Sequence, residues 1–185
     1  MRFVFNERKA AHAASLLLMR HGGRLKYLTL IKLLYLADRR SLVETGYPIT
    51  GDRFVSMDKG PVLSIVKDLI TWEPDEETTP WHEYIVRQGL YDVSLKIQNP
   101  NLDELSKYEI QILEEIDEEF GGMNRWDLVA LTHELPEWED PKGSSVEIDP
   151  ADILRAENKS PDEIRRIGNN AEDIWFVHSL ARKAK

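Results

Sequence analysis

The chain has 185 residues, 42% of them apolar, with no cysteine and a formal net charge of −9. This length and composition fit one compact domain, and the lack of cysteine excludes disulfides, cysteine-based zinc sites and thiol nucleophiles. No stretch approaches the roughly 20 consecutive apolar residues that span a bilayer, and charged residues 7–9 precede the first apolar run. We therefore expect a soluble, cytoplasmic protein without a secretion signal.

The charge is distributed unevenly along the chain. Residues 1–45 contain nine Lys and Arg against three acids, a balance of +6, so the remaining residues carry −15. Acidic residues are dense at 73–77 and 114–120. The overall acidity argues against sequence-independent nucleic-acid binding, which requires a basic surface. We expect the basic and acidic stretches to attract one another within the fold; the alternative is that one of them steers an oppositely charged partner.

Two helices are predicted in the first quarter of the chain. Asn6 is a suitable N-cap for the first, which ends at Gly22 and Gly23. The second is expected from residue 28 to 44, and its apolar residues on several sides favour a central, buried position. Gly46 supplies its left-handed C-cap. The first helix has one apolar face with helical spacing, formed by Ala10, Ala13, Ala14, Leu17 and Leu18.

The next segments alternate between extended chain and turns. Residues 52–57 are expected to form an extended connector, followed by a turn at Gly60 and a helix from Pro61 to about residue 70. Residues 71–81 contain two prolines and four acids, which indicates a surface loop. Residues 84–87 and 90–97 alternate apolar and polar side chains around Gln88 and Gly89, which predicts a β-hairpin whose apolar face lies on the helices.

The second half of the chain is predicted to be helical. Ser106 and Glu109 form a capping box for a helix to residue 120, and Asn124 caps another that Pro136 ends. Two further cap-then-proline starts predict short helices within 149–183 that complete the same unit. The expected fold is mainly α: a single compact helical domain over residues 1–185 with one small antiparallel β-hairpin packed on the helices, α+β by a strict count.

The residues that could perform chemistry form no local catalytic or metal-binding pattern. The five histidines include no pair spaced three or four apart, and the THELPEW segment lacks the second histidine of a zincin because position 137 is Glu. No G-x-S-x-G elbow or phosphate loop is present. We therefore expect no enzyme, metal or cofactor; the least favoured alternative is a hydrolase that uses His133 and dispersed carboxylates, for example Asp52 with Asp58.

Two sequence blocks resemble the Panacea (SocA-like) antitoxin domain. The first comprises the KLLYLA helix at 32–37, the turn at 46–49 and Gly-Pro-Val at 60–62, and the second is NRWDLVALTHELPEW at 124–138. The resemblance extends over roughly residues 7–167. It implies the antitoxin of a toxin–antitoxin system, of the kind found on prophages or mobile elements, that neutralises a cognate protein toxin by direct binding.

Two other modes of action remain open. A related member of the family is an adaptor that delivers its toxin to a protease, and many antitoxins are DNA-binding transcriptional autoregulators. The autoregulator alternative would use a basic surface around Arg39 and Arg40 together with Arg20, Arg24 and Lys26, although the net charge disfavours nucleic acid as a partner. No membrane partner is expected, and a homo-oligomer stays open.

Candidate partner contacts are the polar or aromatic residues near the turns. The apolar motif residues are better interpreted as scaffold. For Arg53 and Asp58 the alternative is a structural role, either pairing with each other or capping the helix expected at Pro61. Trp72 and Trp81 are expected to be exposed because they lie in a polar loop. The candidates are Tyr47, Arg53, Asp58, Lys59, Trp72 and Trp81.

Overall fold

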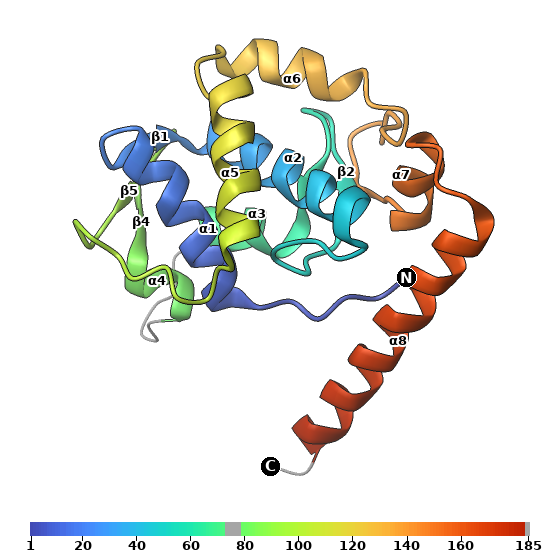
Figure 1. The fold of residues 1–185 in the computed structure, drawn as a ribbon. Helices are drawn as coiled ribbons and strands as arrows, with labels where there is room; N and C mark the ends of the chain where they lie inside the picture. Colours follow the sequence, from blue (N-terminus) through green and yellow to red (C-terminus); the bar gives the residue numbers. More distant parts are fainter. Residues whose placement is uncertain (73–78, 184–185) are drawn as a thin grey trace.

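The computed structural model describes residues 1–72 and 79–183, and within them it contains eight helices and six short strands (Figure 1). The predicted mainly α class, with a small β component, is confirmed. The elements in chain order are α1 (Glu7–Arg20), β1 (Arg24–Lys26), α2 (Tyr27–Thr45), β2 (Phe54–Ser56), β3 (Val62–Leu63), α3 (Ser64–Thr71), α4 (Pro80–Tyr84), β4 (Ile85–Gln88), β5 (Asp92–Leu95), α5 (Lys107–Phe120), α6 (Arg125–His133), β6 (Val146–Glu147), α7 (Pro150–Ala156) and α8 (Pro161–Lys183).

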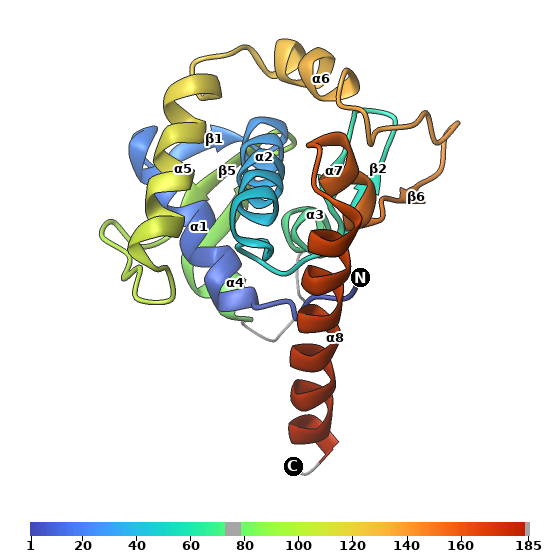
Figure 2. The ribbon, with the colours of Figure 1, turned by 45° about the vertical axis from the view of Figure 1, so that its right-hand side comes forward.

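The helix α2 forms the centre of the fold, as its apolar composition predicts. It contacts α1, α5, α6 and α7, and Figures 1 and 2 show it in the middle of the molecule. Its side chains from Leu28 to Asp38 are all buried, and it ends at Gly46, whose φ of 81° is the left-handed C-cap conformation. The preceding α1 begins at the predicted cap, where the Asn6 side chain accepts a hydrogen bond of 3.0 Å from the Lys9 N–H.

Two small antiparallel sheets flank the helices. The predicted hairpin is confirmed as β4 and β5, and β1 joins it as a third strand in the order β1-β5-β4. Leu25 of β1 pairs with Val93, whose side chain is fully buried. The second sheet has the order β3-β2-β6 and was not predicted, because each of its strands is only two or three residues long.

The expected start of the third helix at Pro61 is wrong. The helix α3 begins three residues later, and Pro61 lies in the turn between β2 and β3, so the expected extended connector is a strand in part. The cap of α3 comes from a residue distant in sequence. The Asp52 carboxylate accepts hydrogen bonds from the N–H groups of Ile65 and Val66 at 3.0 and 2.8 Å, which satisfies donors at the helix start.

The C-terminal helices also differ from the expectation of short helices within 149–183. The helix α7 has seven residues, but α8 has 23 and extends beyond the rest of the molecule (Figure 2). Its first half is anchored by Ile164 and Ile167 against the core and by the fully buried Ala171. Apolar side chains of its second half are exposed, among them Val177 and Leu180. Among the described helices, none is both long and apolar enough to cross a bilayer.

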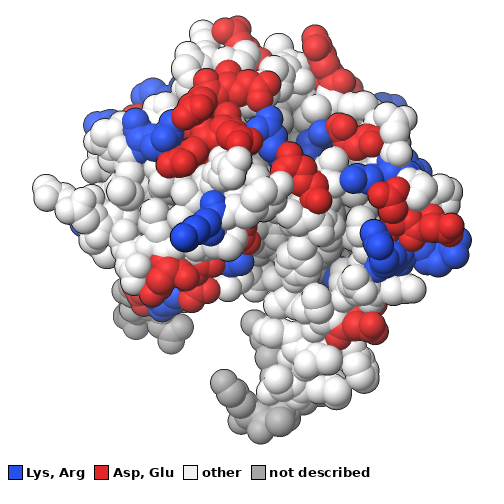
Figure 3. All heavy atoms as spheres, viewed as in Figure 1, with Lys and Arg blue, Asp and Glu red and all other residues white. Residues whose placement is uncertain are grey.

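The acidic face of α5 is bordered by arginines from α1 and α2. Figure 3 shows acidic side chains over α5 with basic side chains on both sides. Arg20 lies 3.7 Å from Glu114 and 3.5 Å from Glu118, and Arg40 lies 2.7 Å from Glu119. The expected attraction between the basic first part of the chain and the acidic remainder is therefore found inside the fold.

Candidate functional site

The motif residues of the two sequence blocks meet at one place, which we call the Gly60 cluster: Lys32, Gly60, Thr132, His133 and Trp138. Lys32 projects from α2, and its side chain is fully buried. Its Nζ atom donates a hydrogen bond of 2.7 Å to the carbonyl oxygen of Pro61, and among the described residues it forms no ion pair. Burial disfavours the charged amine and lowers the pKa of Lys32 to about 7.

Gly60 is the point at which α2, the β2–β3 turn and α6 approach one another. Its φ of 85° is left-handed, and its N–H donates to the Met57 carbonyl oxygen at 2.9 Å. A Cβ atom at this position would lie 2.6 Å from the Thr132 hydroxyl and 2.8 Å from Lys32 Nζ. Only glycine therefore fits both the backbone conformation and the space. The close contacts indicate that the cluster holds the turn and leaves no room for a ligand at Gly60.

His133 closes the cluster at the end of α6. Its ring stacks on Trp138 with a centroid distance of 4.1 Å, and the Trp138 indole N–H donates to the Met57 carbonyl oxygen at 3.1 Å. Burial, and secondarily the neighbouring Lys32 amine, lowers the pKa of His133. The neutral imidazole is thus favoured, and His133 Nε2 is a buried atom without a hydrogen-bond partner among the described residues. The ring serves as a packing element of the turn.

A second buried network joins α2 to the segment after α6. Glu137, whose side chain is 0% exposed, accepts hydrogen bonds from the Tyr35 hydroxyl at 2.8 Å and from Arg39 Nε at 2.7 Å. Burial and the Glu137 charge raise the pKa of Tyr35 well above its usual value. Arg39 also lies 2.7 Å from Glu157. The glutamate of the THELPEW segment is therefore held by a tyrosine and an arginine of the KLLYLADRR helix.

The turn after α2 is fixed by buried carboxylates. Asp38 accepts hydrogen bonds from the Thr50 hydroxyl at 2.5 Å and from the Thr50 N–H at 3.1 Å, and burial raises the pKa of Asp38 to about 7. Asp52 is bonded to the start of α3, and burial raises its pKa as well. These carboxylates are occupied by backbone and hydroxyl donors, so Asp52 has a structural partner and does not face Asp58 as a catalytic pair.

Two of the candidate contact residues have structural partners. The Tyr47 hydroxyl accepts a hydrogen bond of 3.2 Å from the Val4 N–H, and its ring packs edge-on against Phe3 at 4.9 Å. Tyr47 thus holds the N-terminal segment against the fold. Arg53 is exposed, and its guanidinium donates to the Ser64 hydroxyl at 3.4 Å, beside the start of α3.

Three other candidates lie on the surface. Asp58 accepts a hydrogen bond of 3.0 Å from the Gly143 N–H, which ties the β2–β3 turn to the loop before β6. Lys59 is exposed, and its amine lies 5.8 Å from the centroid of the Trp126 ring. Trp72 is 58% exposed at the C-terminal end of α3, as expected. Arg53 and Asp58 therefore bond to different partners, and the cap of α3 is supplied by Asp52 instead.

The expectation that Trp81 is exposed is wrong. Trp81 is 1% exposed, and its backbone N–H donates a hydrogen bond of 3.0 Å to the Glu7 carboxylate. The residues from Pro80 onward form α4, which packs on α1, so the indole points into the core rather than out of a polar loop. Residues 73–78, which include the four acids of the expected loop, lie outside the described part of the chain.

The basic residues of the DNA-binding alternative all face carboxylates. Pairing of this kind neutralises a positive surface before a phosphate reaches it. The shortest printed separations are Arg20 to Asp117 at 2.6 Å, Arg24 to Asp92 at 3.0 Å, Lys26 to Asp92 at 3.0 Å, Arg39 to Glu137 at 2.7 Å and Arg40 to Glu119 at 2.7 Å.

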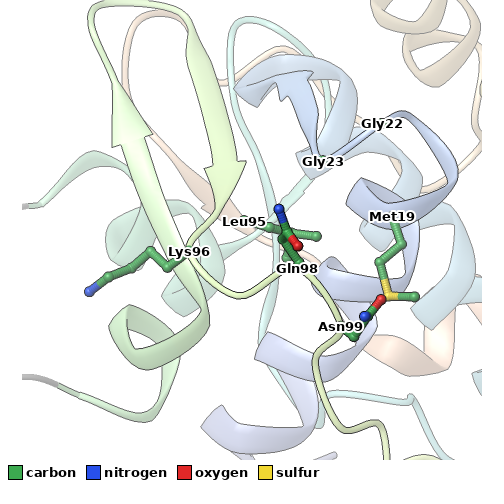
Figure 4. A pocket seen from close by; sticks show the side chains of 7 residues that line it. All are labelled: Met19, Gly22, Gly23, Leu95, Lys96, Gln98 and Asn99. Atoms are coloured by element: carbon green, nitrogen blue, oxygen red, sulfur yellow. The ribbon is translucent and has the colours of Figure 1, made fainter.

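No metal centre is found in the described part of the chain, and one hollow of its surface lacks a free ionisable group. No group of three or more His, Asp or Glu residues there could hold a metal ion. A hollow of about 390 Å³ is lined by Met19, Leu95 and Gln98 among others. Figure 4 shows the Lys96 side chain directed away from it. The Lys96 amine donates to the His82 carbonyl oxygen at 2.7 Å, so this hollow has no free ionisable group at its wall.

The fold and the Gly60 cluster thus define a mainly α domain whose distinctive residues build a turn and its supports. The family described as "Antitoxin SocA-like, Panacea domain" matches residues 30–139, more than half of the chain. The match begins just before Lys32 and ends just after Trp138, so it encloses the whole cluster. The protein belongs to this family of SocA-like antitoxin domains. No curated protein and no solved structure matches the chain.

Proposed function

We propose that this protein is an antitoxin that neutralises a cognate protein toxin by direct binding and without catalysis. The observation that supports this most is the family match over residues 30–139. The Gly60 cluster agrees with a binding role, because Lys32, whose pKa is lowered to about 7, is fully buried, and the half-buried His133 ring is packed against Trp138. A group that cannot reach a substrate cannot transfer a proton to it.

The rigid β2–β3 turn supports the proposed contact role of the residues beside it. Gly60 and Asp58 are fixed by hydrogen bonds on either side of Lys59, so the turn is ordered before a partner arrives. Preorganised segments lose less conformational entropy on binding. Lys59 and Trp72 are the two proposed contacts whose side chains are most accessible to a partner. Tyr47 and Arg53 already form hydrogen bonds within the fold, so their side chains are less free to contact a partner.

We also propose that the chain acts as one unit that includes α8. The first half of this helix is joined to the body of the fold, since Ile167 packs over Gly46 and Met1 packs over Gly168. The Met1 amino group lies 3.6 Å from Asp149, directly before α7. A DNA-binding role receives no comparable support, because the basic residues it requires are paired with acids.

The test is to express the product of the neighbouring open reading frame with and without this chain. We expect growth arrest by the neighbour alone, rescue on coexpression, and recovery of both proteins in one stable complex after purification. The amount of the neighbour in rescued cells distinguishes neutralisation from proteolytic delivery, because an adaptor would deplete it. A neighbour that is harmless alone, or a lack of any complex in rescued cells, would refute the proposal.

A further inference from the structure

Three segments that are distant in sequence bring cationic and aromatic side chains together on the surface. We call this the Trp126 surface, and it consists of Lys59, Tyr91, Arg125 and Trp126. The Arg125 guanidinium carbon lies 5.2 Å from the Trp126 ring centroid and 5.5 Å from that of Tyr91. The Lys59 amine lies 5.8 Å from the Trp126 centroid. Trp126 is therefore flanked by two cations, one from the β2–β3 turn and one from its own helix.

The aromatic rings of this surface are accessible. Trp126 is 50% exposed and Tyr91 is 53% exposed, and the neighbouring Leu90 at the hairpin turn is 72% exposed. Large apolar side chains gathered at one exposed site are uncommon on a surface without a partner, and Trp, Tyr and Arg are the residues that contribute most to protein interfaces. The cation–aromatic contacts hold the rings in place, which reduces the entropy lost on binding.

The cations of the Trp126 surface differ from three arginines of α1 and α2. Arg20, Arg39 and Arg40 all form ion pairs, whereas Lys59 and Arg125 form none with the described residues. Their positive charge is thus available in a chain whose net charge is −9. Asp127 is the acid next to Trp126, and it occupies the first turn of α6, where its charge stabilises the helix N-terminus.

Two acids near this surface have other hydrogen-bond or ion-pair partners. The Asp58 carboxylate accepts the Gly143 N–H, and Asp92, beside Tyr91, is paired with Arg24 and Lys26. We infer that the Trp126 surface binds an acidic segment of the partner protein, whose carboxylates meet Lys59 and Arg125 while an apolar or aromatic side chain covers Trp126. This inference rests on the proposed function, since the partner is the toxin, and it adds the surface and the chemistry of the segment that it binds.

A protein segment fits this surface better than a single-stranded nucleic acid does. Both ligands could stack on aromatic rings and carry negative charge. However, nucleic-acid affinity depends on neutralising several phosphates along a basic track, and the Trp126 surface offers two unpaired cations on an acidic molecule. A short cluster of carboxylates needs no more than these two cations.

The test measures the affinity of the purified toxin for the full chain and for surface variants by titration calorimetry. Trp126→Ala, Arg125→Glu and Lys59→Glu are each expected to weaken binding by about tenfold or more, as truncation or reversal at an interface centre does. Matched controls are Tyr108→Ala and Lys107→Glu, an exposed aromatic and an exposed cation on α5, and both should bind within about threefold of the wild type. Thermal melting establishes that each variant is folded, and the two charge reversals test the surface independently of the tryptophan.

The outcomes separate the inference from the proposed function. If the wild-type complex forms and all three surface variants bind like the controls, the Trp126 surface is not the toxin-binding site, while the proposed antitoxin role is retained. If the wild type neither binds nor rescues growth, both fail. A 15-nucleotide single-stranded oligothymidine is titrated in parallel at low salt. Binding of this probe that is lost in Arg125→Glu, with toxin affinity unchanged, would overturn the protein partner in favour of nucleic acid.

Discussion

The Lys32 amine and the Pro61 carbonyl oxygen lie 2.7 Å apart, and this hydrogen bond joins the central helix to the β2–β3 turn. It connects two of the three parts of the first sequence block, the KLLYLA helix and Gly-Pro-Val. A charged amine normally requires a carboxylate when it is buried, but the described residues place only a carbonyl oxygen at hydrogen-bond distance from this one. Burial therefore favours the neutral amine, which still donates this hydrogen bond to the turn.

This relationship makes stability depend on pH in a defined direction. The pKa of Lys32 falls from 10.5 to about 7 on folding, so between these values the unfolded chain binds more protons than the folded one. Stability contributed by Lys32 is therefore present above pH 10.5 and is lost as the pH falls toward 7, by at most about 1.4 kcal/mol per pH unit. Lys32→Met removes this titration. We expect its stability relative to the wild type to decrease steadily as the pH rises from about 7.5 to about 9.5.

Urea unfolding of both proteins across this range measures the difference. Asp38 does not interfere, because its pKa rises from 3.8 to about 7 and its contribution changes below this window. A constant difference between variant and wild type from about pH 7.5 to 9.5 would contradict the assigned pKa direction of Lys32.

Gly60→Ala is expected to destabilise the fold strongly. The new Cβ atom would meet the Thr132 hydroxyl and the Lys32 amine at 2.6 and 2.8 Å, in addition to the cost of a left-handed φ for alanine. We expect a loss of about 2–4 kcal/mol in the free energy of unfolding, from overpacking together with backbone strain. Gly89→Ala is the matched control, because Gly89 has a φ of 62° with no atom within 4 Å of the added Cβ. It should cost about 1 kcal/mol. Equal losses for the two variants would show that packing around Gly60 is not tight.

The Gly60 turn also marks the limit of what the sequence reveals. Glycine followed by proline indicates a turn, and the N-caps at Asn6 and Ser106 and the C-cap at Gly46 are local signals that place helix ends correctly. The start of α3 was misplaced because its cap is Asp52, twelve residues before the helix. A side chain that arrives through tertiary folding leaves no local pattern.

The same limit applies to the candidate site. The rule that polar residues near turns are exposed correctly identified Lys59, but it missed Trp126 and Tyr91. From the sequence alone, an aromatic residue on an amphipathic helix or hairpin can equally well belong to the core. The prediction for Trp81 is wrong in the opposite direction, because this tryptophan of a polar segment is buried in α4, which packs against α1. Exposure of a large aromatic side chain depends on which element covers it, and that is decided by the tertiary arrangement.

Glu137→Ala is expected to weaken the fold through its two partners. The substitution leaves the Tyr35 hydroxyl buried without its acceptor and removes the bond to Arg39 Nε. Breaking a buried charge pair by removing one member typically costs about 3–5 kcal/mol, and the second carboxylate beside Arg39 reduces this to about 2–4 kcal/mol. Glu157→Ala, at a side chain that is 40% exposed, removes that second carboxylate and should cost about 1 kcal/mol or less. Chemical denaturation measures the free energy of unfolding of both variants. A larger loss for Glu157→Ala would show that Glu157, and not Glu137, is the more important partner of Arg39.

Asp52→Ala tests whether α3 depends on a distant cap. The carboxylate accepts N–H groups from Ile65 and Val66, and both donors would be left without their partner in a site where water has little access. Loss of a cap costs about 1 kcal/mol at the surface, and unsatisfied buried donors raise the expected loss to about 2–3 kcal/mol. Amide hydrogen exchange should locate the effect, with faster exchange in α3 than elsewhere. Asp58→Ala is the control, because the Asp58 carboxylate is exposed and, among the described residues, accepts a single hydrogen bond, from the Gly143 N–H. This substitution should cost about 1 kcal/mol or less and leave α3 protected. If exchange in α3 were unchanged by Asp52→Ala, the helix would not require the cap, and the turn at Gly60 alone would set where it begins.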